Sequence, residues 1–144
     1  MSNEPNLALL VGAALSAVAA LLHVGIILGG APWYRFFGAG ESMARASDAG
    51  RIYPAIVTAL IAATLGLWSV YALSGAGLIA PMPLLKIALM AITAVYLLRG
   101  LAIIPLAVFA RPRVTPFLFW SSLICLGYGA LHLIGLRQVW PTLS

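Results

Sequence analysis

Four long apolar blocks, separated by shorter polar or Gly/Pro-rich connections, dominate the pattern of the chain. They cover residues 7–30, 53–73, 84–109 and 117–140. Each block has about the 20 residues that an α-helix needs to cross a hydrocarbon core about 30 Å thick. We therefore expect four transmembrane helices. Pro105 predicts an early end or a kink near Ile104 in the third helix, because proline cannot donate a backbone hydrogen bond.

The connections differ in length and predict the topology. The first connection, residues 31–52, is long, whereas residues 74–83 and 110–116 are short and contain Gly or Pro. Short links make consecutive spans antiparallel neighbours. The sequence therefore predicts an all-α, integral membrane four-helix bundle with up-down-up-down topology, forming one transmembrane domain over residues 1–144.

The first connection is too apolar to be an ordinary solvated loop. Its aromatic residues between positions 33 and 37 are typical of the headgroup layer. Gly38 and Gly40 permit a tight turn, and the following residues predict a short helix from Glu41 to Ala49, with a Glu41–Arg45 pair and Gly50 at its end. We interpret residues 31–52 as an interfacial or re-entrant segment between the first two spans.

Small residues recur every three or four positions on three of the spans, which permits close helix packing in lipid. They predict packing faces within the bundle, in a homo-oligomer or in a larger membrane complex. They also indicate that both histidines point inward. The positions are Gly12, Ser16, Ala20 and His23 in the first span, Ala55, Ala59 and Ala63 in the second, and Ser122, Cys125, Gly129 and His132 in the fourth.

Composition agrees with the block pattern. The 144 residues are 63% hydrophobic and 8% charged, too few charges for a water-facing surface. The net charge of +5 comes from single basic residues between apolar blocks, so no Lys/Arg run can follow a nucleic acid backbone. Membrane lipids are the expected partners instead. The lone Cys125 cannot form an intramolecular disulfide.

The distribution of Lys and Arg predicts the orientation. The side with the first and third connections carries most of the basic residues, and the other side carries only two. By the positive-inside rule, those two connections are cytoplasmic and both termini are outside. The compact, loop-poor style predicts a multi-pass protein of a bacterial inner membrane with periplasmic termini. The two groups are Arg35, Arg45, Arg51, Arg111 and Arg113 against Lys86 and Arg137.

The polar residues near the cytoplasmic side suggest a binding pocket. Arg99 lies inside an apolar span, where an ionisable side chain costs about 2.5–3.5 kcal/mol on insertion scales. It can either extend to the interface or face inward and pair with Glu41. In the second case, a ligand-binding pocket would be formed by His23, Tyr34, Glu41, Tyr53 and Arg99, suited to an amphipathic molecule with a polar or anionic head.

The sequence pattern predicts no catalytic residue. The three acidic residues Glu4, Glu41 and Asp48 lie outside the apolar blocks, which disfavours a proton-coupled exporter. His23 and His132 could each ligate haem iron, but they differ by roughly 15 Å in depth, so a bis-histidine site is disfavoured. No metal site or cofactor is therefore predicted, with haem or quinone as the alternative.

Three functions remain open. The first is a non-enzymatic binder of a lipophilic or amphipathic ligand, or an accessory subunit of a membrane complex. The second is a haem- or quinone-linked redox protein that uses His23 or His132. The third is an oligomeric transporter or channel that selects anionic solutes with Arg99.

Overall fold

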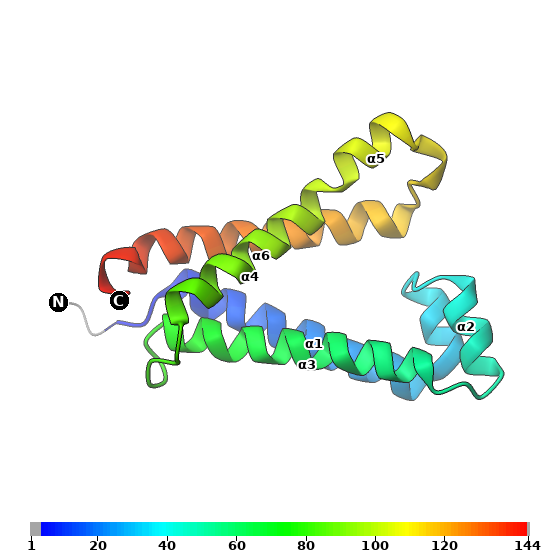
Figure 1. Ribbon diagram of the computed structural model, residues 1–144, viewed down its shortest axis with the longest axis horizontal. Helices are drawn as coiled ribbons and strands as arrows, with labels where there is room; N and C mark the ends of the chain where they lie inside the picture. The colour runs from blue at the N-terminus through cyan, green and yellow to red at the C-terminus, as the bar shows by residue number, and fades with distance from the viewer. Residues whose placement is uncertain (1–3, 144) are drawn as a thin grey trace. The chain divides into compact units, whose positions relative to one another are not determined.

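The computed structural model describes residues 4–143, and over that range it contains helices and no β-strand. Figure 1 shows these elements. In chain order they are α1 (Leu7–Phe36), α2 (Glu41–Asp48), α3 (Tyr53–Gly75), α4 (Leu85–Leu101), α5 (Ile103–Phe109), the 3-10 helix η1 (Arg111–Arg113), α6 (Pro116–Val139) and the 3-10 helix η2 (Trp140–Thr142).

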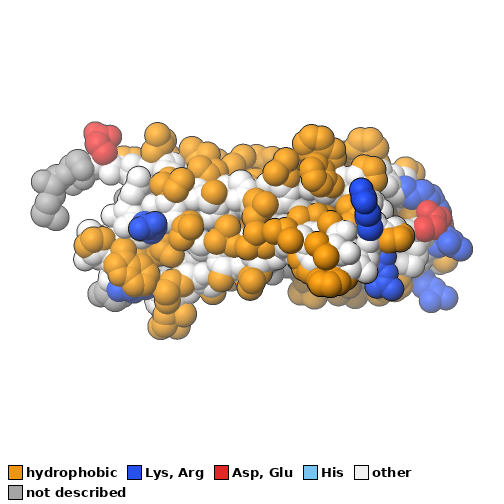
Figure 2. Space-filling model, turned by 90° about the horizontal axis from the view of Figure 1, so that it is seen from above, with side chains coloured by type: hydrophobic (Ala, Val, Ile, Leu, Met, Phe, Trp, Pro, Cys, Tyr) orange, Lys and Arg blue, Asp and Glu red, His pale blue; other side chains and the backbone are white. Residues whose placement is uncertain are grey.

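Four helical stretches are long and apolar enough to cross a membrane. They are Leu7–Phe36, Tyr53–Gly75, Leu85–Phe109 and Pro116–Thr142. The predicted spans are confirmed in this sense, by length and composition, and the all-α class is confirmed for the described residues. Figure 2 shows hydrophobic side chains over much of the visible surface and few charged ones. This composition indicates a membrane protein.

The contacts divide the chain into two compact units. One unit is residues 16–67, and the other combines residues 4–15 with residues 68–143. Helices α1 and α3 each contribute to both units. The single domain and the up-down-up-down topology stay predictions.

The unit of residues 16–67 contains most of α1, all of α2 and the first part of α3. Its apolar core consists of Ile26, Ala31, Tyr34 and Ala44. The predicted short helix is confirmed as α2, which follows a turn in which both Gly38 and Gly40 have positive φ. Glycine adopts this backbone conformation without the steric cost of a Cβ atom.

In the other unit, α4 and α6 lie side by side (Figure 1). A Cβ atom on Gly100 would lie 2.9 Å from the backbone nitrogen of Leu126, and one on Gly129 would lie 3.1 Å from that of Leu97. A glycine on each helix therefore permits this close backbone approach. A separate apolar cluster in the same unit includes Leu9, Ala76, Leu89 and Leu136.

The third span is broken between α4 and α5. The predicted break near Ile104 is at Ala102, which is three residues before Pro105. The physical reason is that Pro105 has no N–H to donate to the carbonyl of Leu101, so the disruption falls on the preceding turn. Beyond the break α5 diverges from α6, and none of its residues is buried (Figure 1).

Candidate functional site

The C-terminal part of α1 bends at Gly30, whose φ of 64° and ψ of −151° are not helical. Pro32 follows within the next turn. The bend turns the Trp33 indole back over α1, where a Cβ atom on Gly29 would lie 2.2 Å from its Cγ atom. Gly25 is also next to the indole, at 3.3 Å from Cζ3 by the same measure. The two glycines are one helical turn apart and have no side chains, so together they form the flat surface on which Trp33 lies.

An open groove of about 380 Å³ lies at this bend. Its lining is Pro32, Trp33, Phe36 and Phe37. The Phe37 ring packs against both other aromatic rings, with centroids 4.9 Å from Phe36 and 5.7 Å from Trp33. The groove is half open, and its lining is apolar. The groove can therefore accept an apolar chain or ring.

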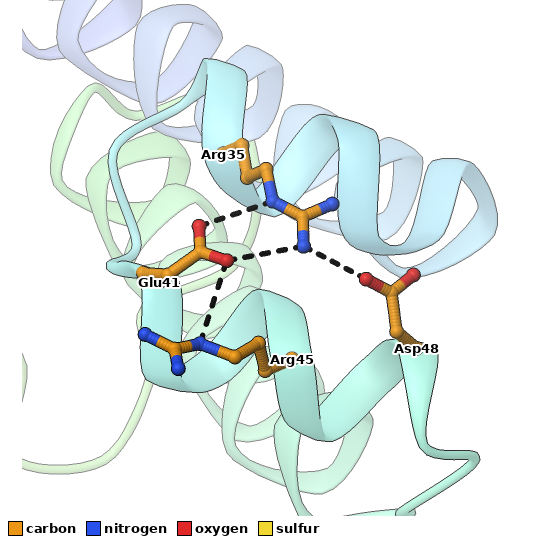
Figure 3. A network of polar contacts seen from close by, with 4 residues as sticks. All are labelled: Arg35, Glu41, Arg45 and Asp48. Atoms are coloured by element: carbon orange, nitrogen blue, oxygen red, sulfur yellow. Dashed lines mark hydrogen bonds and ion pairs between the residues drawn. The ribbon is translucent and has the colours of Figure 1, made fainter.

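An ion-pair network joins the end of α1 to α2 (Figure 3). The Arg35 guanidinium donates from Nε to Glu41 at 3.0 Å and from Nη2 to Glu41 at 3.2 Å and to Asp48 at 2.8 Å. The predicted Glu41–Arg45 pair is confirmed at 3.5 Å. Both carboxylates of the network are thereby committed to arginines of the same unit.

The network changes the acidity of Glu41. The hydrogen bond from Arg35 holds the pKa of Glu41 below its ordinary value, and the charges of Arg35 and Arg45 act in the same direction. Glu41 is an exposed residue, so its pairs are screened by salt. At neutral pH this side chain is an anion held by two cations.

Tyr34, Tyr53 and His23 occupy three different environments in the unit of residues 16–67. Tyr34 is buried, and its hydroxyl lies 3.1 Å from Oγ1 of Thr58 on α3. Tyr53, at the start of α3, is exposed. His23 is half-buried, and its Nδ1 atom lies 2.7 Å from the carbonyl oxygen of Ala19 in its own helix. Tyr34 therefore ties α1 to α3, whereas the contact of His23 is local.

Arg99, in the last turn of α4, has hydroxyl partners on α6. It donates from Nη1 to Ser122 at 3.0 Å and from Nη2 to Ser121 at 3.1 Å. Ser121 in turn donates to the carbonyl of Leu118 at 3.2 Å. Among the ion pairs of residues 4–143, none includes Arg99. This cation in an apolar helix is solvated by hydroxyl oxygens.

His132 is fully buried, which confirms that it points inward. Its Nδ1 atom lies 2.9 Å from the carbonyl oxygen of Tyr128, so this nitrogen carries the proton and Nε2 keeps its lone pair. The Tyr96 ring is at 5.2 Å from the imidazole and also packs on Trp68 and Tyr128. Within the described chain, Nε2 of His132 has no hydrogen-bond partner.

The five residues predicted to form one pocket are distributed over both units. Glu41 is brought together with Arg35 and Arg45, Tyr34 with Thr58, and Arg99 with the two serines. The pocket of all five, and the Arg99–Glu41 pair within it, stay predictions. The sequence analysis missed Arg35 as the centre of the network and Ser121 as a partner of Arg99. An Arg three residues before a Gly-x-Gly turn, and a Ser-Ser pair in an apolar span, are the available signals.

In residues 4–143, no group of three or more His, Cys, Asp or Glu side chains could hold a metal ion. His132 has the more enclosed imidazole of the two histidines.

Comparison with known proteins gave no relative. No family model matches the chain, and no match was found among curated proteins or solved structures. Any assignment of function therefore depends on the geometry described above.

Proposed function

We propose that this protein is a non-enzymatic membrane protein that binds a lipophilic or amphipathic ligand at the bend between α1 and α2. The observation that carries the proposal is the apolar groove of Pro32, Trp33, Phe36 and Phe37 beside a polar network centred on Arg35. An apolar lining next to fixed charges suits a ligand with a tail and a polar head. Membrane lipids are the most available ligands of this kind.

The location of the groove along the chain supports the same proposal. Trp33 and Phe36 lie in the last turns of a candidate span, where aromatic residues mark the headgroup layer. In this layer a ligand can place its head at the charged network and its tail in the hydrocarbon. We propose a multi-pass protein of the bacterial inner membrane, with this bend in the cytoplasmic leaflet and both termini in the periplasm.

Co-purification tests the ligand proposal. The protein is purified in a mild detergent, and bound molecules are extracted and identified by mass spectrometry. We expect a retained amphiphile that is lost from Trp33→Ala and from Gly29→Ala, whose Cβ atom would displace the indole. Trp120→Ala is the matched control, because Trp120 is an exposed tryptophan on α6. Equal retention by Trp33→Ala and the wild type would exclude the groove.

A role as an accessory subunit or a homo-oligomer is compatible with ligand binding. Ala59 and Ala63, two of the three small residues predicted as a face on α3, are exposed. Such a face could accept a helix of another subunit. Size-exclusion chromatography with light scattering measures whether the protein forms a larger assembly.

A haem-linked redox protein is the second candidate, and one observation favours it. The buried His132 keeps a lone pair on Nε2, and this is the atom through which a histidine would bind haem iron. The absorbance spectrum of the purified protein tests this candidate. A Soret band that is lost in His132→Ala would support it, and a protein without visible absorbance would exclude the haem version.

A further inference from the structure

Arg99 is a cation in an apolar helix, with two hydroxyl partners and no ion pair among the described residues. We propose that Arg99, Ser121 and Ser122 form a binding site for an oxyanion, namely a phosphate or a carboxylate group. This site belongs to the unit that contains α4 and α6, and it does not depend on the groove at Trp33. Charge balance, donor geometry and access support it.

The first argument is charge balance. Glu41 and Asp48 both bond to Arg35, and Glu41 also pairs with Arg45, so two cations already balance these two carboxylates. Glu4 is two residues from Asn6, whose side chain bonds to Gln138 near the far end of α6. Along α6, position 138 is about 25 Å from position 121. The described chain thus supplies no carboxylate for Arg99, and an external anion would complete the pair.

The second argument is the number of free donors. A guanidinium has five N–H groups, of which Arg99 uses one for each serine. Ser121 donates its own proton to Leu118 and accepts from Arg99. Ser122 is buried and also accepts from Arg99. Three N–H groups of Arg99 therefore remain for the oxygens of an anion, which Arg binds well in bidentate geometry.

The third argument is access on a fixed support. The close packing of Gly100 on Leu126 holds α4 against α6 immediately beside Arg99. Arg99 itself is exposed, and α5 diverges from α6 beyond the break at Ala102 (Figure 1). Arg111 and Arg113, both exposed, follow α5 in the same unit. Their charges add a positive potential that attracts anions toward this end of the helices.

The oxyanion can come from two sources, and a binding experiment distinguishes them. Delipidated protein is titrated with phosphatidylglycerol or with diacylglycerol of identical chains, which lacks the phosphate, and binding is measured by native mass spectrometry. We expect phosphatidylglycerol to bind about ten- to hundredfold more tightly, the range that one charged hydrogen-bonded pair accounts for. Competition by millimolar inorganic phosphate would identify a free anion as the ligand, whereas its absence would identify the lipid headgroup.

The variants locate the site. Arg99→Gln should abolish the preference for phosphatidylglycerol and any competition by phosphate. Arg137→Gln removes an equal charge from the last turn of α6, the helix that carries the two serines. This variant should preserve the lipid preference and any competition by phosphate. The double variant Ser121→Ala/Ser122→Ala keeps the cation and should weaken binding severalfold, which is informative even where Arg99→Gln fails to fold. Retention of the full preference in Arg99→Gln, or equal binding of the two lipids by the wild type, would overturn the proposal. Trp33→Ala should leave the preference for phosphatidylglycerol unchanged. A failure of the ligand proposal at the groove is therefore distinguishable from a failure of the oxyanion site at Arg99.

Discussion

Gly12 determines whether the imidazole of His132 fits between its neighbours. A Cβ atom at position 12 would lie 2.8 Å from Cε1 and 3.0 Å from Nδ1 of the imidazole. The ring is fully buried, packs against Tyr96 and is hydrogen-bonded through Nδ1 to Tyr128, so it has little room to yield. A small residue on α1 is therefore a packing requirement of a polar side chain on α6.

We expect Gly12→Ala to lower the free energy of unfolding by about 1–3 kcal/mol, the usual cost of overpacking a core. Unfolding in a titration of denaturing detergent measures the change. Gly127→Ala on α6 is the control, because its Cβ atom would meet no atom within 4 Å. A Gly12→Ala variant as stable as Gly127→Ala would contradict the packing shown around His132.

The acidity of Glu41 gives a second prediction for single residues. Its pKa is lowered in the folded protein, so its stabilising contribution is present above the ordinary pKa and is lost as the pH falls through the folded value. We expect the contacts of Arg35 to Glu41 to persist through neutral pH and to break only below the ordinary range of a glutamate. A carboxyl-carbon NMR titration in nanodiscs measures the folded pKa directly.

Arg35→Gln is the diagnostic variant for this titration. The hydrogen bond from Arg35 is the largest cause of the lowered pKa, so its loss should raise the pKa of Glu41 toward the ordinary value. Arg45→Gln should raise the pKa less, because Arg45 makes one contact with Glu41, at 3.5 Å, whereas Arg35 donates two shorter hydrogen bonds. If the two variants gave the same pKa, Arg35 would not be the centre of the network.

At the scale of elements, the bend of α1 is attributable to one glycine. Gly30 has φ of 64° and ψ of −151°, a combination that is essentially confined to glycine. A Cβ atom there would meet nothing closer than Ser47 Oγ at 3.9 Å. Glycine is therefore required at this position by the backbone conformation and not by a lack of space for a side chain. The position of α2 and of the aromatic groove thus depends on a single backbone conformation.

Gly30→Ala should therefore cost about 1–3 kcal/mol in the bent form, or straighten α1 to avoid that strain. Either result should change the environment of Trp33, which the emission maximum of a variant with Trp33 as its single tryptophan reports. Gly66→Ala in α3 has open space around its Cβ atom and should leave the emission unchanged. An unchanged spectrum in Gly30→Ala would show that the bend does not need glycine.

The elements were predictable where the cause is local. Span ends agree with α1, α3 and α6 to within a few residues, apart from the continuation of α1 past Gly30, and α2 was expected from Glu41 onward. Apolar runs, glycines and i,i+4 pairs each lie within one helix or turn, so the sequence alone is enough to predict them. Arg35 bonds to residues 6 and 13 positions away, which requires the turn at Gly38 and Gly40 to bring α2 back along α1.

Contacts between helices could not be predicted in the same way. Arg99 and Ser122 are 23 positions apart, and they meet only because Gly100 and Gly129 permit close approach of α4 and α6. The sequence indicated small residues on α6 but not which helix they face. The aromatic surroundings of His132 from α3 and α4 depend on the same three-dimensional packing.

At the scale of the whole molecule, orientation in the membrane is set by the distribution of charge. The connections after α1 and after α5 carry most of the arginines, and Lys86 and Arg137 are the basic residues near the other ends of the spans. Lys86 is further occupied by the carbonyl of Leu143 and by the Trp140 ring, at 4.3 Å from its centroid. The arginine-rich ends should therefore face the cytoplasm.

Cysteine labelling in intact bacterial cells tests this orientation. In a Cys125→Ser background, a membrane-impermeant maleimide should label Glu4→Cys and Gly77→Cys from outside, whereas Ala39→Cys should react only after the membrane is permeabilised. Glu4, Gly77 and Ala39 are all exposed, so accessibility of the side chain is matched and the membrane is the variable. Labelling of Ala39→Cys alone in intact cells would reverse the orientation. Labelling of all three positions in intact cells would contradict membrane insertion of the four helices, because residue 39 lies between two candidate spans.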